Sequence, residues 1–319
     1  MEFRPSSDQE ALQAGVRSFC DGRVPADALP DLAKRGGFDR ALWSELADLG
    51  VFGLRVPESE GGVGLGGADA VLVFEELGRR LVPGPLLWSH LAAGLVPGAA
   101  SGEVVVGGLD AASEPCLVEH LDALDVLLVL REGALHRVDP RALEAQPIEF
   151  PLDPLTPLHH VVELPRGERI AGVDGAELRR VGTALAAAQL LGIAVATQEL
   201  ATAYAKQREQ FGRPIGSFQA IKHLLADAFV RQEVARATVY AAGAILDDPG
   251  AGDVERATGG AKLVAGEAAL RNARTCIQVH GGMGYTWEVP AHFYLKRTWV
   301  LESVFGTGEA HAARLAGRL

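Results

Sequence analysis

The chain has few cysteines, and they form no recognisable pattern. Its 319 residues include only Cys20, Cys116 and Cys276. An odd number of cysteines without metal-ligand spacing argues against a disulfide framework and against a structural metal site. We therefore expect three free thiols in a reducing compartment, and no bound metal.

Positive charge and long apolar runs are also scarce. The chain carries 30 Lys and Arg against 41 Asp and Glu, a net charge of -11, which argues against a nucleic acid or an anionic membrane as a partner. Local arginines can still bind an anionic cofactor. Residues 1–5 are too polar for a signal peptide, and no run approaches the ~20 apolar residues of a membrane span. These features predict a cytoplasmic protein without membrane contact.

Helical periodicity is present near the start of the chain, where hydrophobic residues recur every three or four positions. Leu12, Val16 and Phe19 fall on one helical face, and residues 71–81 resume the helical pattern. Hydrophobic residues make up 48% of the whole chain, which is enough for a large core. Residues 1–100 therefore predict a helical N-terminal domain.

The pattern changes to short β-type runs in the middle of the chain. Pro, Gly and Asp separate these runs, as is typical of strands joined by turns. The runs cover residues 103–106, 126–130 and 160–164. We expect a small β domain over residues 101–175.

Four long helical segments follow and extend to the C-terminus. Short Gly- and Pro-containing turns separate them, and this arrangement favours an antiparallel bundle. The segments are expected at 178–204, from 218, at 254–279 and after Pro290. Residues 176–319 therefore predict a C-terminal four-helix bundle, and the fold class is mainly α.

A first segment with chemical potential is REQFGRPIGSFQ at residues 208–219. Arg208 offers a planar fork of donors that suits a phosphate or pyrophosphate. Phe211 offers a flat apolar surface, and Gly212 lets the backbone approach a ligand. On local features alone, an ordinary helix-loop-helix corner with an exposed arginine is the favoured explanation of the segment.

A second segment is CIQVHGGMGY at residues 276–285. Its three glycines permit close backbone approach to a ligand, and Gln278 supplies both a donor and an acceptor. For the segment in isolation, a glycine stop at the end of a helix is the better explanation. For His280 we expect a structural or exposed position and no role in catalysis.

Both segments resemble signatures of the acyl-CoA dehydrogenase family, flavoproteins that oxidise acyl-CoA thioesters to 2-enoyl-CoAs. The strings LGVFGLRVPESEGGVGLG at 49–66 and FEELGR at 74–79 resemble the N-terminal domain of the same family. The resemblance implies a helical N-terminal domain, a middle β domain and a C-terminal four-helix bundle. Compared with the family, the middle β domain of this chain is reduced.

The resemblance also implies FAD, shared across a subunit interface. Six residues are expected to line the ADP half of the FAD of a neighbouring subunit: Arg208, Phe211, Gln219, Gln278, Gly281 and Gly282. Thr307 and Glu309 match further family positions that can touch FAD.

The catalytic carboxylate of the family is missing. Dehydrogenation needs a base that takes the α-proton while the flavin accepts the β-hydride. Phe305 and Gly182 occupy the two positions where family members carry this base. The loop of type T-E-x-x-x-G-S-D and the W-x-T strand, which contact the flavin ring in the family, are absent as well.

These departures resemble the short, base-less subunits of heterotetrameric actinobacterial steroid-CoA dehydrogenases. They imply a non-catalytic subunit whose full-length partner supplies the Glu, the ring contacts and most of the acyl pocket. The expected substrate is an acyl-CoA, with a steroid side chain as a candidate, and an electron-transfer flavoprotein is the family's usual acceptor. Two alternatives stay open: a flavin-free scaffold or regulatory paralogue, and a self-sufficient homo-oligomer with Glu309 or Glu199 as a displaced base.

Overall fold

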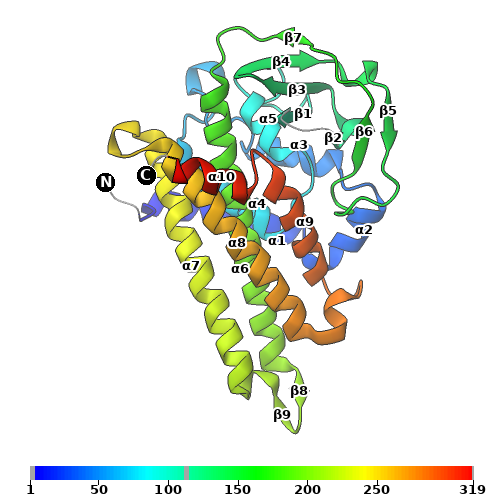
Figure 1. Cartoon of the computed structure of the whole chain (residues 1–319), viewed down its shortest axis with the longest axis vertical. Coiled ribbons are helices and arrows are strands. Elements are labelled where there is room, and N and C mark those ends of the chain that lie inside the picture. The colour runs from blue at the N-terminus through cyan, green and yellow to red at the C-terminus, as the bar shows by residue number, and fades with distance from the viewer. Residues whose placement is uncertain (1–3, 111–114, 318–319) are drawn as a thin grey trace. The chain divides into compact units, whose positions relative to one another are not determined.

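The computed structural model describes residues 4–110 and 115–317 and is mainly helical, as the sequence predicts (Figure 1). The chain divides into two compact units, each built from discontinuous segments. Unit 1 comprises Met1–Pro30, Val71–Val82 and Thr183–Leu319, and unit 2 comprises Asp31–Ala70 and Pro83–Gly182. The domain boundaries expected near residues 100 and 175 stay predictions.

Unit 1 contains the long helices of the C-terminal half together with helices from the N-terminal half. Helices α7 and α8 pack along each other (Figure 1). The helices that lie wholly or mostly in unit 1 are α1 (Ser7–Arg23), α4 (Gly67–Arg79), α6 (Gly175–Gln207), α7 (Gln219–Asp247), α8 (Val254–His280), α9 (Ala291–Ser303) and α10 (Gly308–Ala316).

Side chains cap the N-termini of several of these helices. Ser6 and Gln9 form a reciprocal capping box at the start of α1. Asp253 and Thr307 accept backbone hydrogen bonds at the starts of α8 and α10. Such caps satisfy backbone donors that a helix leaves free at its N-terminus.

Helix α6 is the core helix of unit 1, and glycines let α4 approach it closely. An added Cβ at Gly78 would collide with the carbonyl oxygen of Gln189, and one at Gly192 with that of Glu75. Helix α6 is also long and apolar enough to cross a membrane on length and composition, which the sequence analysis did not anticipate. Because 94% of its most apolar window is buried inside the protein, α6 serves as a core helix here.

Unit 2 combines two small sheets with short helices. One sheet has the strand order β1-β3-β4-β7 and the other β2-β6-β5. The strands are β1 (Val106–Asp110), β2 (Cys116–Glu119), β3 (Val126–Arg131), β4 (Ala134–Val138), β5 (Ala145–Pro147), β6 (Leu158–Val161) and β7 (Glu168–Arg169). The helices of unit 2 are α3 (Arg40–Asp48), α5 (Leu86–Ala92) and most of α2 (Leu29–Lys34).

Strand β3 is an interior strand of its four-stranded sheet, and its buried position explains why the sequence pattern locates it most accurately. It pairs in parallel with β1 and antiparallel with β4, and its first five residues are all buried. A strand buried on both faces appears as an unbroken apolar run. The runs expected at 103–106 and 160–164 are displaced by a few residues relative to β1 and β6.

Candidate functional site

The first candidate segment forms a tight hairpin between α6 and α7. Strands β8 (Glu209–Gln210) and β9 (Arg213–Pro214) pair antiparallel, and the two turn residues, Phe211 and Gly212, have φ angles of +53° and +77°. Two left-handed residues are typical of a type I′ turn, which favours Asn and Gly. A phenylalanine in this conformation costs about 1 kcal/mol, and the Phe211 side chain is 92% exposed. Within the fold, the ring makes an edge-to-face contact with Phe218, at 6.1 Å between centroids, and most of its surface stays open to solvent.

The two arginines of this hairpin differ in their surroundings. The guanidinium of Arg213 stacks over the ring of Phe218, 4.2 Å from its centroid. The guanidinium of Arg208 is exposed, and within the described part of the chain it forms no hydrogen bond or ion pair. Gln219, the first residue of α7, is exposed nearby. Arg208 therefore keeps its whole donor set for an external anion.

The second candidate segment lies at the C-terminal end of α8. Gln278, Gly281 and Gly282 are exposed. Gly281 has a φ angle of +62°, and an added Cβ at either glycine would meet nothing within 4 Å. The backbone is thus open to a ligand here. His280 is buried, with 5% exposure, and so has the structural position expected of it.

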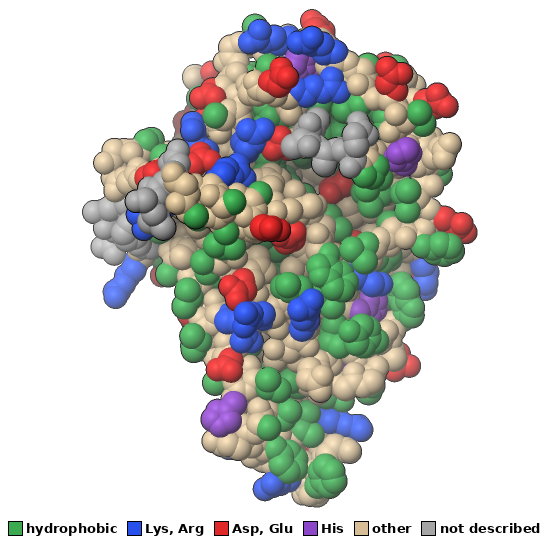
Figure 2. Space-filling model, viewed as in Figure 1, with side chains coloured by type: hydrophobic (Ala, Val, Ile, Leu, Met, Phe, Trp, Pro, Cys, Tyr) green, Lys and Arg blue, Asp and Glu red, His purple; other side chains and the backbone are tan. Residues whose placement is uncertain are grey.

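A shared apolar cluster joins the two segments at one end of the helical bundle. Ile215 and Ile221, from the first segment and the start of α7, pack against a buried core that includes Ala205 of α6 and Ile277 of α8. Hydrophobic and basic side chains lie together at the tip that carries β8 and β9 (Figure 2). Six of the eight residues expected to bind FAD are therefore placed on one exposed surface, which we call the signature surface: Arg208, Phe211, Gln219, Gln278, Gly281 and Gly282.

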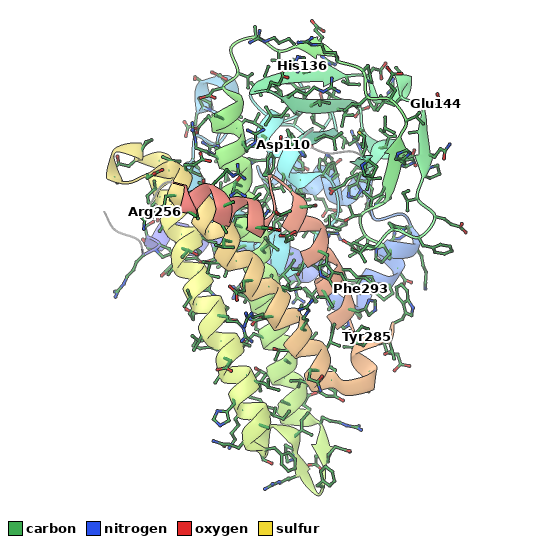
Figure 3. All side chains as sticks on the ribbon, viewed as in Figure 1. Asp110, His136, Glu144, Arg256, Tyr285 and Phe293 are labelled. Carbon is green, nitrogen blue, oxygen red and sulfur yellow. The ribbon has the colours of Figure 1, made fainter. Side chains whose placement is uncertain are left out.

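Thr307 and Glu309 lie elsewhere. Both are exposed at the start of α10, where a Cβ at Gly308 would lie 3.4 Å from the side chain of Leu263 on α8. Gln278 is fifteen residues further along α8, a distance of roughly 22 Å in an α-helix. Figure 3 marks the same separation, with Arg256 near one end of α8 and Tyr285 just beyond the other. The structure thus separates these two residues from the signature surface.

The loop that carries Phe305 is held by a buried lysine that the sequence analysis missed. The Phe305 side chain is 2% exposed and its φ angle is +56°. Lys262 Nζ donates to the carbonyl oxygens of Glu302, Val304 and Gly306 at 3.2, 2.6 and 3.1 Å, and burial lowers the pKa of Lys262 to about 8. The sequence does contain a signal that could have identified Lys262, because it is a lone lysine in the Ala- and Gly-rich stretch of α8.

The carboxylates considered as alternatives to the family's base are either engaged in a backbone hydrogen bond or exposed. Glu302 Oε1 accepts a hydrogen bond from the backbone N–H of Gly308 at 2.8 Å. Glu199 and Glu309 are exposed on α6 and α10, and Gly182 is buried on α6. Among the described residues, no group of three or more His, Cys, Asp and Glu side chains could hold a metal ion.

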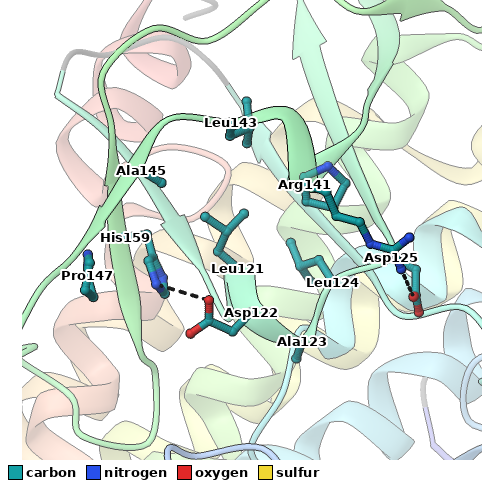
Figure 4. A pocket seen from close by; sticks show the side chains of 11 residues that line it. Leu121, Asp122, Ala123, Leu124, Asp125, Arg141, Leu143, Ala145, Pro147 and His159 are labelled. Atoms are coloured by element: carbon teal, nitrogen blue, oxygen red, sulfur yellow. Dashed lines mark ion pairs between the residues drawn. The ribbon is translucent and has the colours of Figure 1, made fainter.

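Unit 2 contains a separate cavity of about 570 Å³ (Figure 4). Its wall carries two loose ion pairs: His159 with Asp122, whose nitrogen and oxygen are 3.4 Å apart, and Arg141 with Asp125 at 3.6 Å. None of the residues expected to bind FAD lines this cavity.

Comparisons with known proteins agree with the fold and with the two signatures. Residues 6–102 match the N-terminal domain of acyl-CoA dehydrogenases, and residues 179–319 match the C-terminal domain. The acyl-CoA dehydrogenase IpdE2 of Mycobacterium tuberculosis is 34% identical, over 92% of this chain and 91% of its own length. FadE34 of the same organism, also an acyl-CoA dehydrogenase, is 33% identical over 92% of this chain, which spans only 44% of FadE34.

A solved structure supports the same assignment over nearly the whole chain. The structure of a Tcur3481-Tcur3483 steroid ACAD variant superimposes with a TM-score of 0.86, covers 97% of each chain and is 25% identical. Two matched domains and a relative aligned along most of both chains leave one conclusion: the chain belongs to the acyl-CoA dehydrogenase family.

Proposed function

We propose that this chain is the non-catalytic subunit of a heteromeric acyl-CoA dehydrogenase. One observation carries the proposal: a buried Phe305 stands at a base position of the family, while the residues of two FAD signatures are exposed together on one end of the bundle. Phenylalanine cannot accept a proton, and dehydrogenation needs a base for the α-proton. A partner subunit would supply that base and the flavin-ring contacts.

The residues of the signature surface fit the ADP half of an FAD held by such a partner. Arg208 has an unused planar fork for a pyrophosphate, and Gly281 and Gly282 leave the backbone open. Phe211 offers an exposed ring for stacking despite its left-handed backbone. The bound flavin supplies the hydride acceptor of the reaction. The residues of this chain bind and orient it and move no proton.

Two relatives support the heteromeric arrangement and the substrate class. Because this chain corresponds to less than half of FadE34, FadE34 has room for a second segment of similar length in the same polypeptide. We propose that a separate partner subunit takes the place of such a segment here. The steroid ACAD named above supports a bulky acyl-CoA, such as a steroid side-chain thioester, as the substrate.

The proposal is tested on the complex with a full-length acyl-CoA dehydrogenase subunit from the same organism, and we expect this complex to be cytoplasmic. Arg208→Ala should release the flavin from the purified complex without breaking the complex apart. Arg256→Ala is the matched control, because Arg256 is also exposed but lies near the opposite end of α8 (Figure 3), and it should leave the flavin content unchanged. If Arg208→Ala retains a full complement of flavin, the signature surface does not bind it.

The same experiment addresses the alternatives. A flavin-free scaffold would give a colourless complex even with the unmodified chain. A self-sufficient enzyme would give flavin and activity from this chain alone, with Glu199 or Glu309 as its base. Both carboxylates are exposed at the surface of the chain, so no observation favours this reading.

A further inference from the structure

Tyr204, in the last turn of α6, contacts both parts of the signature surface. Its carbonyl oxygen accepts a hydrogen bond from the backbone N–H of Arg208 at 2.8 Å. Its ring stacks on the imidazole of His280, with centroids 4.1 Å apart and planes 26° from parallel. Its hydroxyl lies 4.0 Å from the sulfur of Met283. Tyr204 thus connects the hairpin after α6, through its backbone carbonyl, with the glycine segment after α8, through its side chain.

His280 is a fixed partner for this stack. It is the last residue of α8 and is buried, and its Nδ1 lies 2.8 Å from the carbonyl oxygen of Cys276. Because a carbonyl oxygen can only accept, Nδ1 carries the proton. Burial lowers the pKa of His280, so the imidazole is neutral at neutral pH. The contact is therefore a stack of two neutral rings anchored to the helix backbone.

Residues of the signature surface lie within four positions of each of the two stacked rings in the sequence. Arg208 comes four residues after Tyr204, and the backbone N–H of Ile215 closes the hairpin onto the Arg208 carbonyl at 2.8 Å. Gln278 precedes His280 by two residues, and Gly281 and Gly282 follow it immediately. A change in the separation of the two rings would move Arg208 relative to the glycine backbone.

We infer that Tyr204 and His280 are a positioning pair, which sets the spacing between Arg208 and the glycine segment and thereby the affinity of the surface for the ADP half of FAD. The inference rests on the proposed function. The pair acts through the residues beside it and does not contact the cofactor. Ring stacking, and not the Tyr204 hydroxyl, carries the effect, because the hydroxyl reaches only a weak thioether acceptor.

The test measures the Kd for FAD and the Tm of the complex with the partner subunit. Tyr204→Leu removes the ring and should raise the Kd about tenfold, the equivalent of one strong aromatic pair. Tyr204→Phe keeps the ring and should bind FAD as the unmodified complex does. His280→Phe also keeps a stacked ring and should raise the Kd less than His280→Leu. The double variant Tyr204→Leu/His280→Leu should bind FAD about as weakly as Tyr204→Leu alone, because each of the two changes removes the same ring contact.

Tyr240→Leu separates positioning from general stability. Tyr240 lies on α7 and donates to Glu75 at 2.7 Å, so its loss should lower the Tm and leave the Kd for FAD unchanged. The inference of a positioning pair is wrong if Tyr204→Phe weakens FAD binding as much as Tyr204→Leu does. It is also wrong if the effects of Tyr204→Leu and His280→Leu on the Kd add fully in the double variant. If Arg208→Ala weakens binding but Tyr204→Leu does not, the positioning pair is wrong and the proposed function stands. If Arg208→Ala leaves the Kd unchanged, the proposed function itself fails.

Discussion

The carboxylate of Glu75 lies 2.7 Å from the guanidinium of Arg236, and this ion pair joins α4 to α7 inside unit 1. The Glu75 side chain has no exposed surface. Tyr240 and Gln13 also donate to it, at 2.7 and 3.2 Å. Burial raises the pKa of Glu75, although Arg236 opposes the shift. The buried carboxylate of Glu75 therefore links α4 to α7 only as long as its cation and its hydrogen-bond donors are in place.

Arg236→Met should lower the free energy of unfolding by about 3 kcal/mol, because it leaves the Glu75 carboxylate buried without its cation. Urea unfolding measures the change. Arg271→Met is the matched control, since Arg271 pairs with Glu267 at 2.7 Å where both side chains are more than half exposed. The control should cost less than about 1 kcal/mol. Equal losses in the two variants would show that burial of Glu75 does not matter.

Stability should fall as the pH drops from 6.5 towards 4, and His90 on α5 should contribute to this fall. His90 is buried against the carbonyl oxygen of Val51 at 3.0 Å, and burial lowers its pKa to about 4. An unfolded histidine has a pKa of about 6.5. Between these values the unfolded chain binds a proton that the folded chain does not, so the unfolding free energy decreases with falling pH.

His90→Gln, which does not titrate, should reduce the slope of unfolding free energy against pH in this window. The effect of one group is at most about 1.4 kcal/mol per pH unit. His223→Gln, at an exposed position on α7, should leave the slope unchanged. A slope that is identical in the unmodified chain and in His90→Gln would assign the acid sensitivity to other groups.

Lys262→Met should destabilise the loop at residues 302–308. The substitution removes three hydrogen bonds to the carbonyls of Glu302, Val304 and Gly306, and buried acceptors without donors are costly, at about 3 kcal/mol for the set. Hydrogen exchange of this loop should become faster, and the Tm should fall. Lys222→Met, at an exposed position of α7, should change neither quantity. Unchanged loop exchange in Lys262→Met would mean that Phe305 is held by other contacts.

Phe211→Asn should separate stability from cofactor binding. Asn adopts left-handed φ angles more readily than Phe, but the substitution also removes the edge-to-face contact with Phe218. Because the two effects are of similar size, the unfolding free energy should change by less than about 1 kcal/mol. The flavin content of the complex should fall at the same time, because the exposed ring is lost. A variant of unchanged stability that keeps its flavin would show that the ring has no role in binding.

The helices could be predicted from the sequence because their signals are local. The bounds expected for the third long helix, 254–279, differ from α8 by one residue, and the run at 126–130 lies within β3. The final helical stretch was expected to be continuous, but the structure breaks it between α9 and α10. Phe305 and Gly306 both have positive φ angles there, and nothing in the hydrophobic pattern indicates a phenylalanine in that conformation.

The signature residues could be named from the sequence, but their arrangement depends on contacts between distant segments. Tyr204 and His280 are 76 positions apart in the sequence and stack in the structure. Lys262 bonds to carbonyls about 40 positions further along the chain, and a backbone acceptor leaves no trace in the sequence. The separation of Thr307 and Glu309 from the other six residues likewise follows from the packing of α10 on α8.

The measurement that tests the central claim most directly is the visible absorption spectrum and native mass of this chain, first alone and then co-purified with a full-length acyl-CoA dehydrogenase subunit from the same organism. We predict a colourless chain alone and a yellow complex with about one FAD for each pair of unlike chains. A chain that is yellow by itself, and that bleaches when an acyl-CoA is added, would contradict the account.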